Sequence, residues 1–228
     1  MKKKLPFKKG LIVSCQAYPG DPLYGAGFMA AMAKAAQMGG AVGIRAQGIK
    51  DIRAIQAQVK LPVIAIIKKT YPGSAVYITP TSREVKALLR LKPEIIALDA
   101  TLRYRPGGER LKDLIGMIHA GGSLAMADVS TLKEAEEAGK MGVDLLSTTL
   151  AGYTPQSRKM QGPDLDLLKK IIGASGVPVI GEGRFETSEQ VEEAMKRGAC
   201  AVVIGRAITI PQAITRKFVL AAKRGMKS

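Results

Sequence analysis

Short apolar runs alternate with segments of helical periodicity along the whole chain. Each run is almost continuously apolar, which is typical of parallel strands that are buried on both faces. Such runs therefore predict strands rather than exposed loops. Eight runs are present, at residues 11–17, 41–46, 62–68, 94–100, 123–129, 143–150, 177–183 and 201–208.

The segments between these runs have the spacing of amphipathic helices, and several of them end at glycine, as helix C-termini often do. Thr81-Ser82-Arg83-Glu84 resembles a capping box and predicts the start of one helix. The helices are expected at residues 27–38, 49–59, from 81 onward, 108–120, from 130 to about 141, 163–174, from 187 onward and 211–223.

Eight strand-then-helix units in 228 residues predict an α/β fold, a single (β/α)8 TIM barrel domain spanning residues 1–228. The alternative is an open doubly wound sheet. That fold favours a glycine-rich dinucleotide loop after its first strand, and Gln16-Ala17-Tyr18-Pro19-Gly20 lacks this pattern. We therefore expect the sheet to close into a barrel.

Polar side chains end nearly every apolar run. In TIM barrels the active site lies at the carboxyl ends of the strands. A single polar strand end only marks where polarity begins, whereas seven of them around one barrel mouth predict a functional site. The residues at these ends are Gln16, Arg45, Lys68, Asp99, Asp128, Ser147 or Thr148, Glu182 and Gly205-Arg206.

Glycine turns follow the seventh and eighth runs. They are Gly181-Glu182-Gly183-Arg184 and Ile204-Gly205-Arg206-Ala207. Loops after strands 7 and 8 of a TIM barrel frequently bind phosphate through backbone N–H groups. The sequence therefore predicts phosphate-binding loops after these two strands, formed by Gly183, Arg184, Gly205 and Arg206.

Composition adds a strongly basic charge to this picture. Lys and Arg number 35 against 19 acidic residues, giving a net charge of +16, which attracts anions. Nucleic acid is one such partner, but aromatics make up only 4% and no nucleic-acid motif is present, so an anionic metabolite fits better. Two cysteines fit a reducing cytoplasm, and no apolar run has the length of a signal sequence or a membrane span.

Few residues are available for catalysis. The single histidine, His119, precedes the fifth strand, so it is expected at the end of the barrel opposite the active site, where residues contribute to stability. No metal site is predicted. Binding of Mg²⁺ by Asp99 and Asp128 is the alternative. Lys68 and Glu182 lie on strands three and seven, which face each other across a barrel, and such a pair can move a proton between two faces of a substrate. Lys68 could instead be a counter-ion for the substrate, or it could form a Schiff base with a carbonyl substrate, as lysines do in aldolases. Glu182 could instead form an ion pair with Arg45 or Arg184.

Motifs at every strand end give a more specific indication. Together they resemble the bacterial N-acetylmannosamine-6-phosphate 2-epimerases, and the resemblance runs from about residue 11 to residue 217. The motifs are Ser14-Cys15-Gln16-Ala17, Gly43-Ile44-Arg45-Ala46, Ile66-Ile67-Lys68-Lys69, Ala97-Leu98-Asp99-Ala100-Thr101, Met126-Ala127-Asp128-Val129-Ser130-Thr131, Thr148-Thr149-Leu150-Ala151-Gly152-Tyr153-Thr154 and Gly181-Glu182-Gly183-Arg184.

The resemblance implies conversion of N-acetylmannosamine 6-phosphate to N-acetylglucosamine 6-phosphate in cytoplasmic sialic acid breakdown, without cofactor or metal. It implies that Lys68 and Glu182 move the proton at C2 after ring opening, with participation of the substrate's acetamido group as an alternative. The resemblance further suggests a homodimer. The apolar residues of the last helix, Phe218, Val219 and Leu220, could contribute to the dimer contact, and packing in the core explains them equally well. The sugar-binding residues are then expected to be Gln16, Arg45, Asp99, Asp128 and Tyr153.

One position departs from the pattern of the family it resembles. After strand eight that pattern has arginine where this chain has Ile210, and an arginine stands four positions earlier, at Arg206. Residues four apart share one face of a regular helix. The hypothesis is that Arg206 supplies the missing phosphate charge.

Overall fold

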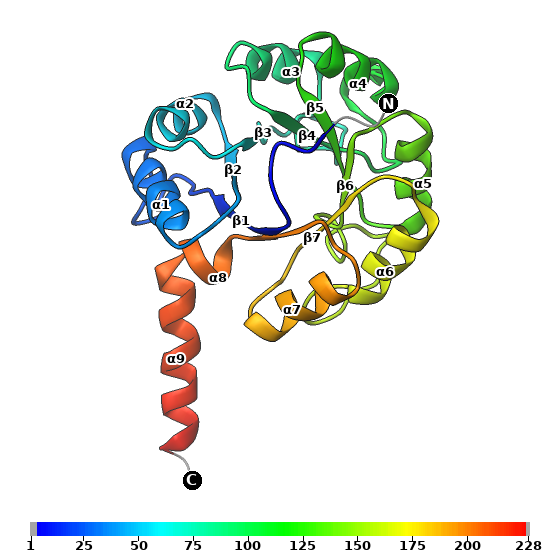
Figure 1. Ribbon diagram of the computed structural model, residues 1–228. Coiled ribbons are helices and arrows are strands. Elements are labelled where there is room, and N and C mark those ends of the chain that lie inside the picture. The colour runs from blue at the N-terminus through cyan, green and yellow to red at the C-terminus, as the bar shows by residue number, and fades with distance from the viewer. Residues whose placement is uncertain (1–3, 227–228) are drawn as a thin grey trace.

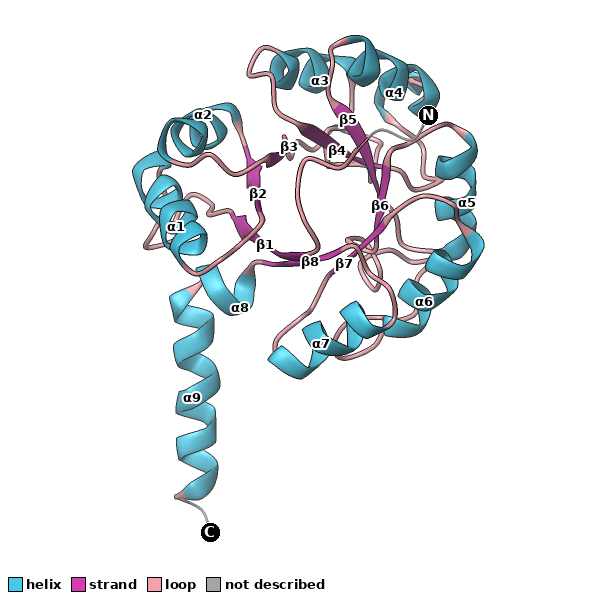
Figure 2. Cartoon of the chain, in the orientation of Figure 1, coloured by secondary structure: helices cyan, strands magenta, loops and turns pink. Residues whose placement is uncertain are grey.

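Eight parallel strands close into a barrel in the computed structural model, which describes residues 4–226. Every strand pairs with its neighbours in sequence, and β8 returns to pair with β1 (Figures 1 and 2). The predicted barrel is therefore confirmed. The strands are β1 (Gly10–Cys15), β2 (Gly43–Gln47), β3 (Val63–Ile66), β4 (Ile95–Asp99), β5 (Leu124–Asp128), β6 (Leu145–Ser147), β7 (Val179–Glu182) and β8 (Ala201–Ile204).

Helices alternate with the strands and form the outer layer of the barrel (Figure 1). Three of them begin with complete capping boxes, in which a threonine hydroxyl and a Glu or Gln side chain satisfy free N–H groups of the first turn. The helices are α1 (Ala26–Met38), α2 (Ile49–Gln58), α3 (Ser82–Leu89), α4 (Leu111–Ala120), α5 (Leu132–Lys140), α6 (Leu165–Ala174), α7 (Ser188–Lys196), α8 (Arg206–Thr209) and α9 (Pro211–Gly225), with a 3-10 turn, η1 (Pro106–Gly108), before α4.

Two apolar layers explain why the strands are almost continuously apolar. One layer fills the barrel interior and includes Ile12, Ile64 and Ile180. The other lies between the strands and the surrounding helices and includes Ile44, Val63 and many alanines. Because each strand contributes alternate side chains to both layers, neither face of the sheet is open to water. Polar side chains can enter the interior only at its ends.

The eighth unit differs from the sequence prediction. The predicted strand at 201–208 ends at Ile204, and Arg206 begins the short helix α8. The backbone of Ile210 (φ −118°, ψ 84°) interrupts the helix before α9 starts at Pro211. The premise of one regular helix through positions 206 and 210 was therefore wrong.

Helix α9 extends away from the barrel instead of lying against it (Figures 1 and 2). None of its described side chains is buried, and Phe218 is 68% exposed. Core packing therefore does not account for Phe218, Val219 and Leu220, all of which are exposed.

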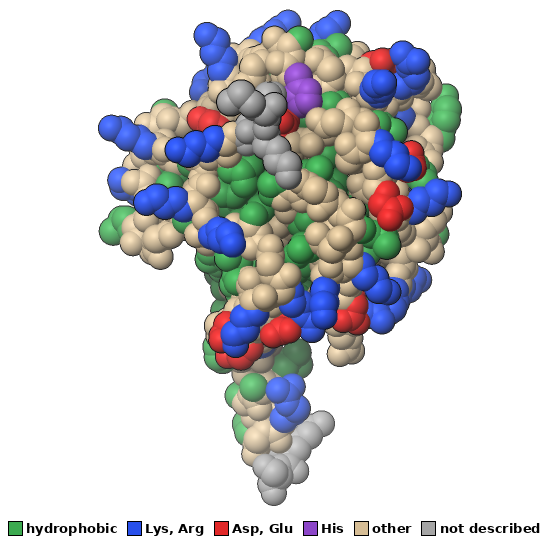
Figure 3. Space-filling view, turned by 45° about the vertical axis from the view of Figure 1, so that its right-hand side comes forward, with side chains coloured by type: hydrophobic (Ala, Val, Ile, Leu, Met, Phe, Trp, Pro, Cys, Tyr) green, Lys and Arg blue, Asp and Glu red, His purple; other side chains and the backbone are tan. Residues whose placement is uncertain are grey.

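Lys and Arg side chains are dispersed over the face in Figure 3, with Asp and Glu among them, rather than gathered in one stripe. On this face the basic side chains therefore form no single continuous patch. Within residues 4–226, no helix combines the length and hydropathy that crossing a membrane requires.

Candidate active site

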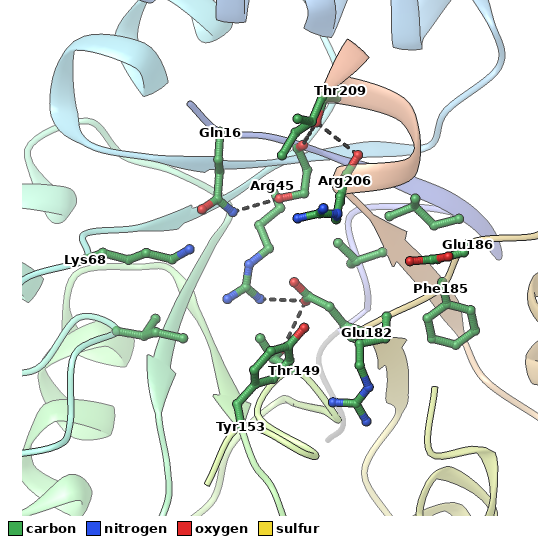
Figure 4. Close-up of a pocket in the computed structure, with 18 of the residues that line it drawn as sticks. Gln16, Arg45, Lys68, Thr149, Tyr153, Glu182, Phe185, Glu186, Arg206 and Thr209 are labelled. Carbon is green, nitrogen blue, oxygen red and sulfur yellow. Dashed lines mark hydrogen bonds and ion pairs between the residues drawn. The ribbon is translucent and has the colours of Figure 1, made fainter. Parts of the chain in front are cut away.

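A cavity of about 350 Å³ opens at the carboxyl ends of the strands, where the polar strand ends converge. Figure 4 shows side chains from several different strands and loops pointing into it. A site in which each wall comes from a different strand is typical of TIM barrel enzymes. Of the residues predicted from the sequence, the cavity brings together Gln16, Arg45, Lys68, Tyr153, Glu182, Gly183, Arg184, Gly205 and Arg206.

Arg45 lies at the floor of this cavity and is only 1% exposed. Its Nη1 and Nη2 atoms donate to both carboxylate oxygens of Asp128, at 3.1 and 2.6 Å, and Nη1 also donates to Glu182 Oε2 at 2.9 Å. Burial by itself would lower the pKa of Arg45, but the two carboxylates raise it above its ordinary value. A permanent cation is therefore fixed between two acids at the end of the barrel interior.

The Glu182 carboxylate extends from the end of β7 into the cavity, with its side chain 13% exposed. Besides Arg45, the Thr149 hydroxyl lies 3.0 Å from Oε2, within hydrogen-bond distance. Burial raises the pKa of Glu182, while Arg45 opposes that rise. Within residues 4–226, the hydrogen bonds to this carboxylate all reach Oε2. Its other oxygen, Oε1, is left for a ligand, so the predicted ion pair with Arg45 and a chemical role are compatible.

Asp128 does not reach the cavity and is fully buried. It accepts hydrogen bonds from Arg45 and, at 2.7 Å, from the Thr149 hydroxyl. The expectation that Asp128 contacts the sugar directly therefore needs correction, because its oxygens are occupied one layer below the cavity. Its position indicates that it orients Arg45 and Thr149.

Asp99 is likewise fully buried and away from the cavity wall. It accepts hydrogen bonds from the Thr101 hydroxyl and from Arg103 Nη2, both at 2.7 Å. Direct sugar binding by Asp99 is thus not supported, since these groups use its carboxylate to hold the loop after β4.

Among the described residues, no cluster of three or more His, Cys, Asp or Glu side chains is arranged to hold a metal ion.

Lys68 is held by a hairpin rather than by the strand itself. Strand β3 ends at Ile66, and the chain then turns back so that Lys68 forms an antiparallel bridge with Ile78. Thr79 fixes this return with a left-handed backbone (φ 44°), unusual for a β-branched residue, and its hydroxyl donates to the Ala97 carbonyl at 2.7 Å. The hairpin places the Lys68 side chain at the cavity wall.

Lys68 and Glu182 enter the cavity from opposite sides, with the Arg45 guanidinium between them (Figure 4). The Lys68 ammonium donates to the Tyr18 hydroxyl at 2.6 Å. Tyr77 also lines this wall, and burial raises its pKa to about 12, with Asp128 adding to the rise. Its hydroxyl therefore stays protonated at neutral pH and can donate a hydrogen bond.

Glycine turns form the wall next to β7 and β8, as the sequence predicts. Gly183 has a positive φ of 105°, which favours glycine, and Gly205 passes so close to Ser14 that a Cβ would lie 3.2 Å from the Ser14 Cβ. Both glycines line the cavity, and the Arg206 side chain points into it (Figure 4). A negatively charged group bound here would contact the backbone of the glycine turns and the Arg206 guanidinium.

Arg184, which the sequence predicts as a phosphate ligand, also has a structural role. Its guanidinium donates to the carbonyls of Ala151 at 2.6 Å and Gly162 at 2.8 Å, and it lies 5.2 Å from the centroid of the Tyr153 ring. Two of its nitrogens therefore hold the loop after β6, whereas the buried Nη2 has no hydrogen-bond partner among the described residues, and Arg184 lines the cavity.

The remaining predicted residues complete the walls. Gln16 Nε2 donates to the Ser14 hydroxyl at 2.7 Å, whereas its buried Oε1 has no hydrogen-bond partner among the described residues. Tyr153 is 58% exposed and lies at the rim. Because a buried acceptor without a donor is costly, the Gln16 amide is suited to a hydroxyl-bearing ligand.

Sequence reasoning did not identify several polar residues that the structure places in the wall, among them Ser14, Tyr18, Tyr77, Thr149, Glu186 and Thr209.

Comparison with known proteins shows similarity over nearly the whole chain. A family model described as "Putative N-acetylmannosamine-6-phosphate epimerase" matches residues 29–224. A relative from Clostridium perfringens strain SM101, named "Putative N-acetylmannosamine-6-phosphate 2-epimerase", is 53% identical over 92% of this chain and 96% of its own length. A protein with the same name from Caldanaerobacter subterraneus is 49% identical over 93% of this chain and 90% of its own.

Solved structures agree with these matches. The N-acetylmannosamine-6-phosphate 2-epimerase from Clostridium perfringens superposes with a TM-score of 0.90 and 52% identity, over 92% of this chain and 91% of that one. A thiamine phosphate pyrophosphorylase from Pyrococcus furiosus has a TM-score of 0.58 at 16% identity, over 88% and 87% of the two chains. The second similarity shows the shared barrel fold alone.

Proposed function

The chain belongs to the N-acetylmannosamine-6-phosphate 2-epimerase family, and from this premise we propose how its cavity performs the reaction. The protein is an isomerase that interconverts N-acetylmannosamine 6-phosphate and N-acetylglucosamine 6-phosphate. The observation that carries the proposed mechanism is the entry of an amine, from Lys68, and a carboxylate, from Glu182, into one cavity from opposite sides.

The reaction inverts one carbon, which requires a proton to leave one face of C2 and another to arrive on the opposite face. Opening of the sugar ring exposes an aldehyde at C1, and the neighbouring carbonyl acidifies the C2 proton. In one direction the neutral Lys68 amine removes this proton and protonated Glu182 delivers one to the other face. Burial raises the pKa of Glu182, which favours the protonated form that this step needs. In the other direction the roles are exchanged.

Negative charge develops on the C1 oxygen while C2 is deprotonated. The Arg45 guanidinium and the protonated Tyr77 hydroxyl are the groups suited to stabilise it, because both lie at the cavity wall. Gln16 Oε1 is suited to accept a hydrogen bond from a sugar hydroxyl, and Tyr153 covers the rim. Asp99 and Asp128 support the site from the layer below.

The phosphate is assigned to the wall formed by Gly183, Arg184, Gly205 and Arg206, where two of the Arg184 side-chain nitrogens are already engaged by backbone carbonyls. Glycine turns let the ligand approach the backbone closely, and Arg206 adds a guanidinium that can pair with phosphate in two hydrogen bonds. Although α8 and α9 are not one regular helix, both Arg206 and Ile210 line the cavity. This supports the idea that Arg206 supplies the charge that Ile210 lacks.

Substituting Arg206 tests the phosphate site. Arg206→Ala is expected to raise KM for the phosphorylated sugar about 10- to 100-fold, since a charge-assisted hydrogen bond contributes roughly 1.5–3 kcal/mol. Steady-state kinetics measure the change, and Lys223→Ala, which removes a cation on exposed α9, is the matched control. An unchanged KM in Arg206→Ala would place the phosphate elsewhere.

The activity itself is tested by following N-acetylmannosamine 6-phosphate by NMR until the N-acetylglucosamine isomer appears. Borohydride is added in a parallel sample to trap any Schiff base on Lys68, which the aldolase alternative requires. Epimer formation without a trapped adduct supports the proposed reaction. A covalent adduct with no epimer would support the aldolase, and salt-sensitive binding without turnover would indicate an anion-binding protein.

We also propose a homodimer built on α9. Its exposed Phe218, Val219 and Leu220 extend beyond their own barrel. A groove of about 440 Å³ runs beside the helix, and both apolar residues, such as Ala213 and Ile214, and charged residues, such as Arg216 and Lys217, line it. Exposed apolar surface of this kind marks an interaction site. A second copy is the occupant favoured here, because Phe218 and Leu220 are exposed and line the groove, so two such faces could cover each other's apolar side chains.

Charge introduced on this helix tests the dimer. Phe218→Glu is expected to convert a dimer into a monomer in sedimentation velocity experiments, because it places a carboxylate in the apolar contact. Lys223→Glu changes charge on the same helix outside the groove and should leave the dimer intact. A parent protein that sediments as a monomer would refute the dimer.

We place the reaction in the cytoplasm. Both cysteines, Cys15 and Cys200, are free thiols. Reducing compartments keep thiols in this form.

A further inference from the structure

We propose that Tyr18 is the positioning residue for Lys68, a role that rests on the proposed function. The Tyr18 hydroxyl accepts a hydrogen bond from the Lys68 ammonium at 2.6 Å, and the same ammonium lies 5.3 Å from the centroid of the Tyr18 ring. Tyr18 comes from the loop after β1, two strands away from the hairpin that carries Lys68. The contact thus joins two separate walls of the cavity.

A lysine that removes a proton from one particular carbon atom must have its amine held in a defined position, and a contact of this kind can hold it. Its side chain has four rotatable bonds, and a long flexible arm loses entropy when it is held in one place. Among the described ion pairs none involves Lys68, in contrast to Arg45, which two carboxylates hold. The hydrogen bond from Nζ to Tyr18 is therefore the restraint that this structure provides at the reactive atom.

Tyr18 is itself held in place, so it can serve as a fixed point. Its backbone N–H donates to Asp21 Oδ2 at 2.7 Å, and the Asp21 N–H donates to the Tyr18 carbonyl at 2.9 Å. These two bonds close a tight turn directly after β1. Asp21 also receives a hydrogen bond from Gln212 of α9 at 3.4 Å. The loop is thereby tied to the opposite end of the chain.

The contact suits both protonation states of Lys68. A charged ammonium has three N–H groups, and one of them bonds to the Tyr18 oxygen. A neutral amine has two N–H groups and one lone pair, so it can keep the bond to Tyr18 and direct the lone pair at the C2 proton. Tyr18 accepts in both states and gives up no proton, which leaves the overall proton balance of the epimerisation unchanged.

The test is Tyr18→Phe, which removes the hydroxyl and keeps the ring. Displacing a catalytic group by about 1 Å can cost on the order of 10²-fold in rate, so kcat is expected to fall about 10- to 100-fold with KM changed less than about twofold. Tyr24→Phe is the matched control, because Tyr24 is on the same loop, is 51% exposed and does not line the cavity. Its kcat should equal that of the parent.

Tyr18 is 45% exposed, so Tyr18→Phe should fold normally, and circular dichroism will verify this. Asp21→Ala, which loosens the turn, is a second variant and should also lower kcat with little change in KM. Unchanged kcat in folded Tyr18→Phe, or a loss confined to KM, would overturn the positioning role. A parent that forms no epimer would instead refute the proposed function, so the two failures are distinguishable.

Discussion

Replacing Lys68 with alanine is expected to lower kcat on the order of 10²- to 10⁴-fold while the barrel remains folded. General acid–base catalysis contributes this much to a reaction, and the variant removes the amine that takes the C2 proton. The side chain lies at the cavity wall, outside both apolar layers, so its loss leaves the core unchanged. Steady-state kinetics with N-acetylmannosamine 6-phosphate measure the effect.

Lys69→Ala is the matched control for this prediction. Lys69 is adjacent in sequence but is exposed, and its ammonium lies 5.1 Å from the centroid of the Tyr71 ring, outside the cavity. Its removal should change kcat less than about twofold. If Lys68→Ala retained most of the parental kcat, or if the control lost as much, the assignment of the base to Lys68 would be wrong.

Removing the Arg45 side chain is expected to lower the free energy of unfolding more than any other substitution proposed for this protein. Arg45 and Asp128 are 1% and 0% exposed, and breaking a buried ion pair from one side costs about 3–5 kcal/mol because the remaining charge is left unpaired. The free energy of unfolding of Arg45→Ala, measured in urea, should fall by about this amount. The variant should also lose activity, since Glu182 loses the group that holds its Oε2 atom.

An exposed ion pair provides the comparison. Arg110 and Asp113 are 79% and 54% exposed, and Arg110→Ala should leave the free energy of unfolding almost unchanged, because water screens an exposed ion pair. The loss in Arg45→Ala should become smaller as the pH falls, because a protonated Glu182 no longer needs a cation beside it. Equal, small losses in both variants would show that the buried network contributes little to stability.

Much of the fold followed from sequence because local pattern and global topology agree. Apolar runs and capping residues predicted every strand and most helix starts to within a few residues. His119 lies in the last turn of α4 and contacts Asp144, just before β6, which confirms its placement away from the cavity. The eighth unit was less predictable, because an amphipathic helix such as α9 has the same pattern whether it covers its own barrel or extends beyond it.

The candidate site was predictable only where a residue's place depends on the strand that carries it. Glu182 and Arg45 meet because strand ends converge, and Lys68 joins them because its hairpin begins directly after the end of β3. Tyr18 and Tyr77 were missed because a loop turn and the hairpin between Lys68 and Ile78 place them, and neither leaves a periodic signal. Asp99 and Asp128 lie buried outside the cavity lining, and a strand-end position does not reveal whether a neighbouring arginine already occupies the carboxylate.

Exchange of the C2 proton with solvent in D2O, followed by NMR for each epimer separately, tests the two-base geometry most directly. With bases on opposite walls, Lys68→Ala should still exchange the C2 proton of one epimer, and Glu182→Gln that of the other, with neither variant forming epimer. Loss of exchange from the same epimer in both variants, or from both epimers in either one, would contradict the assignment of one base to each face of the sugar.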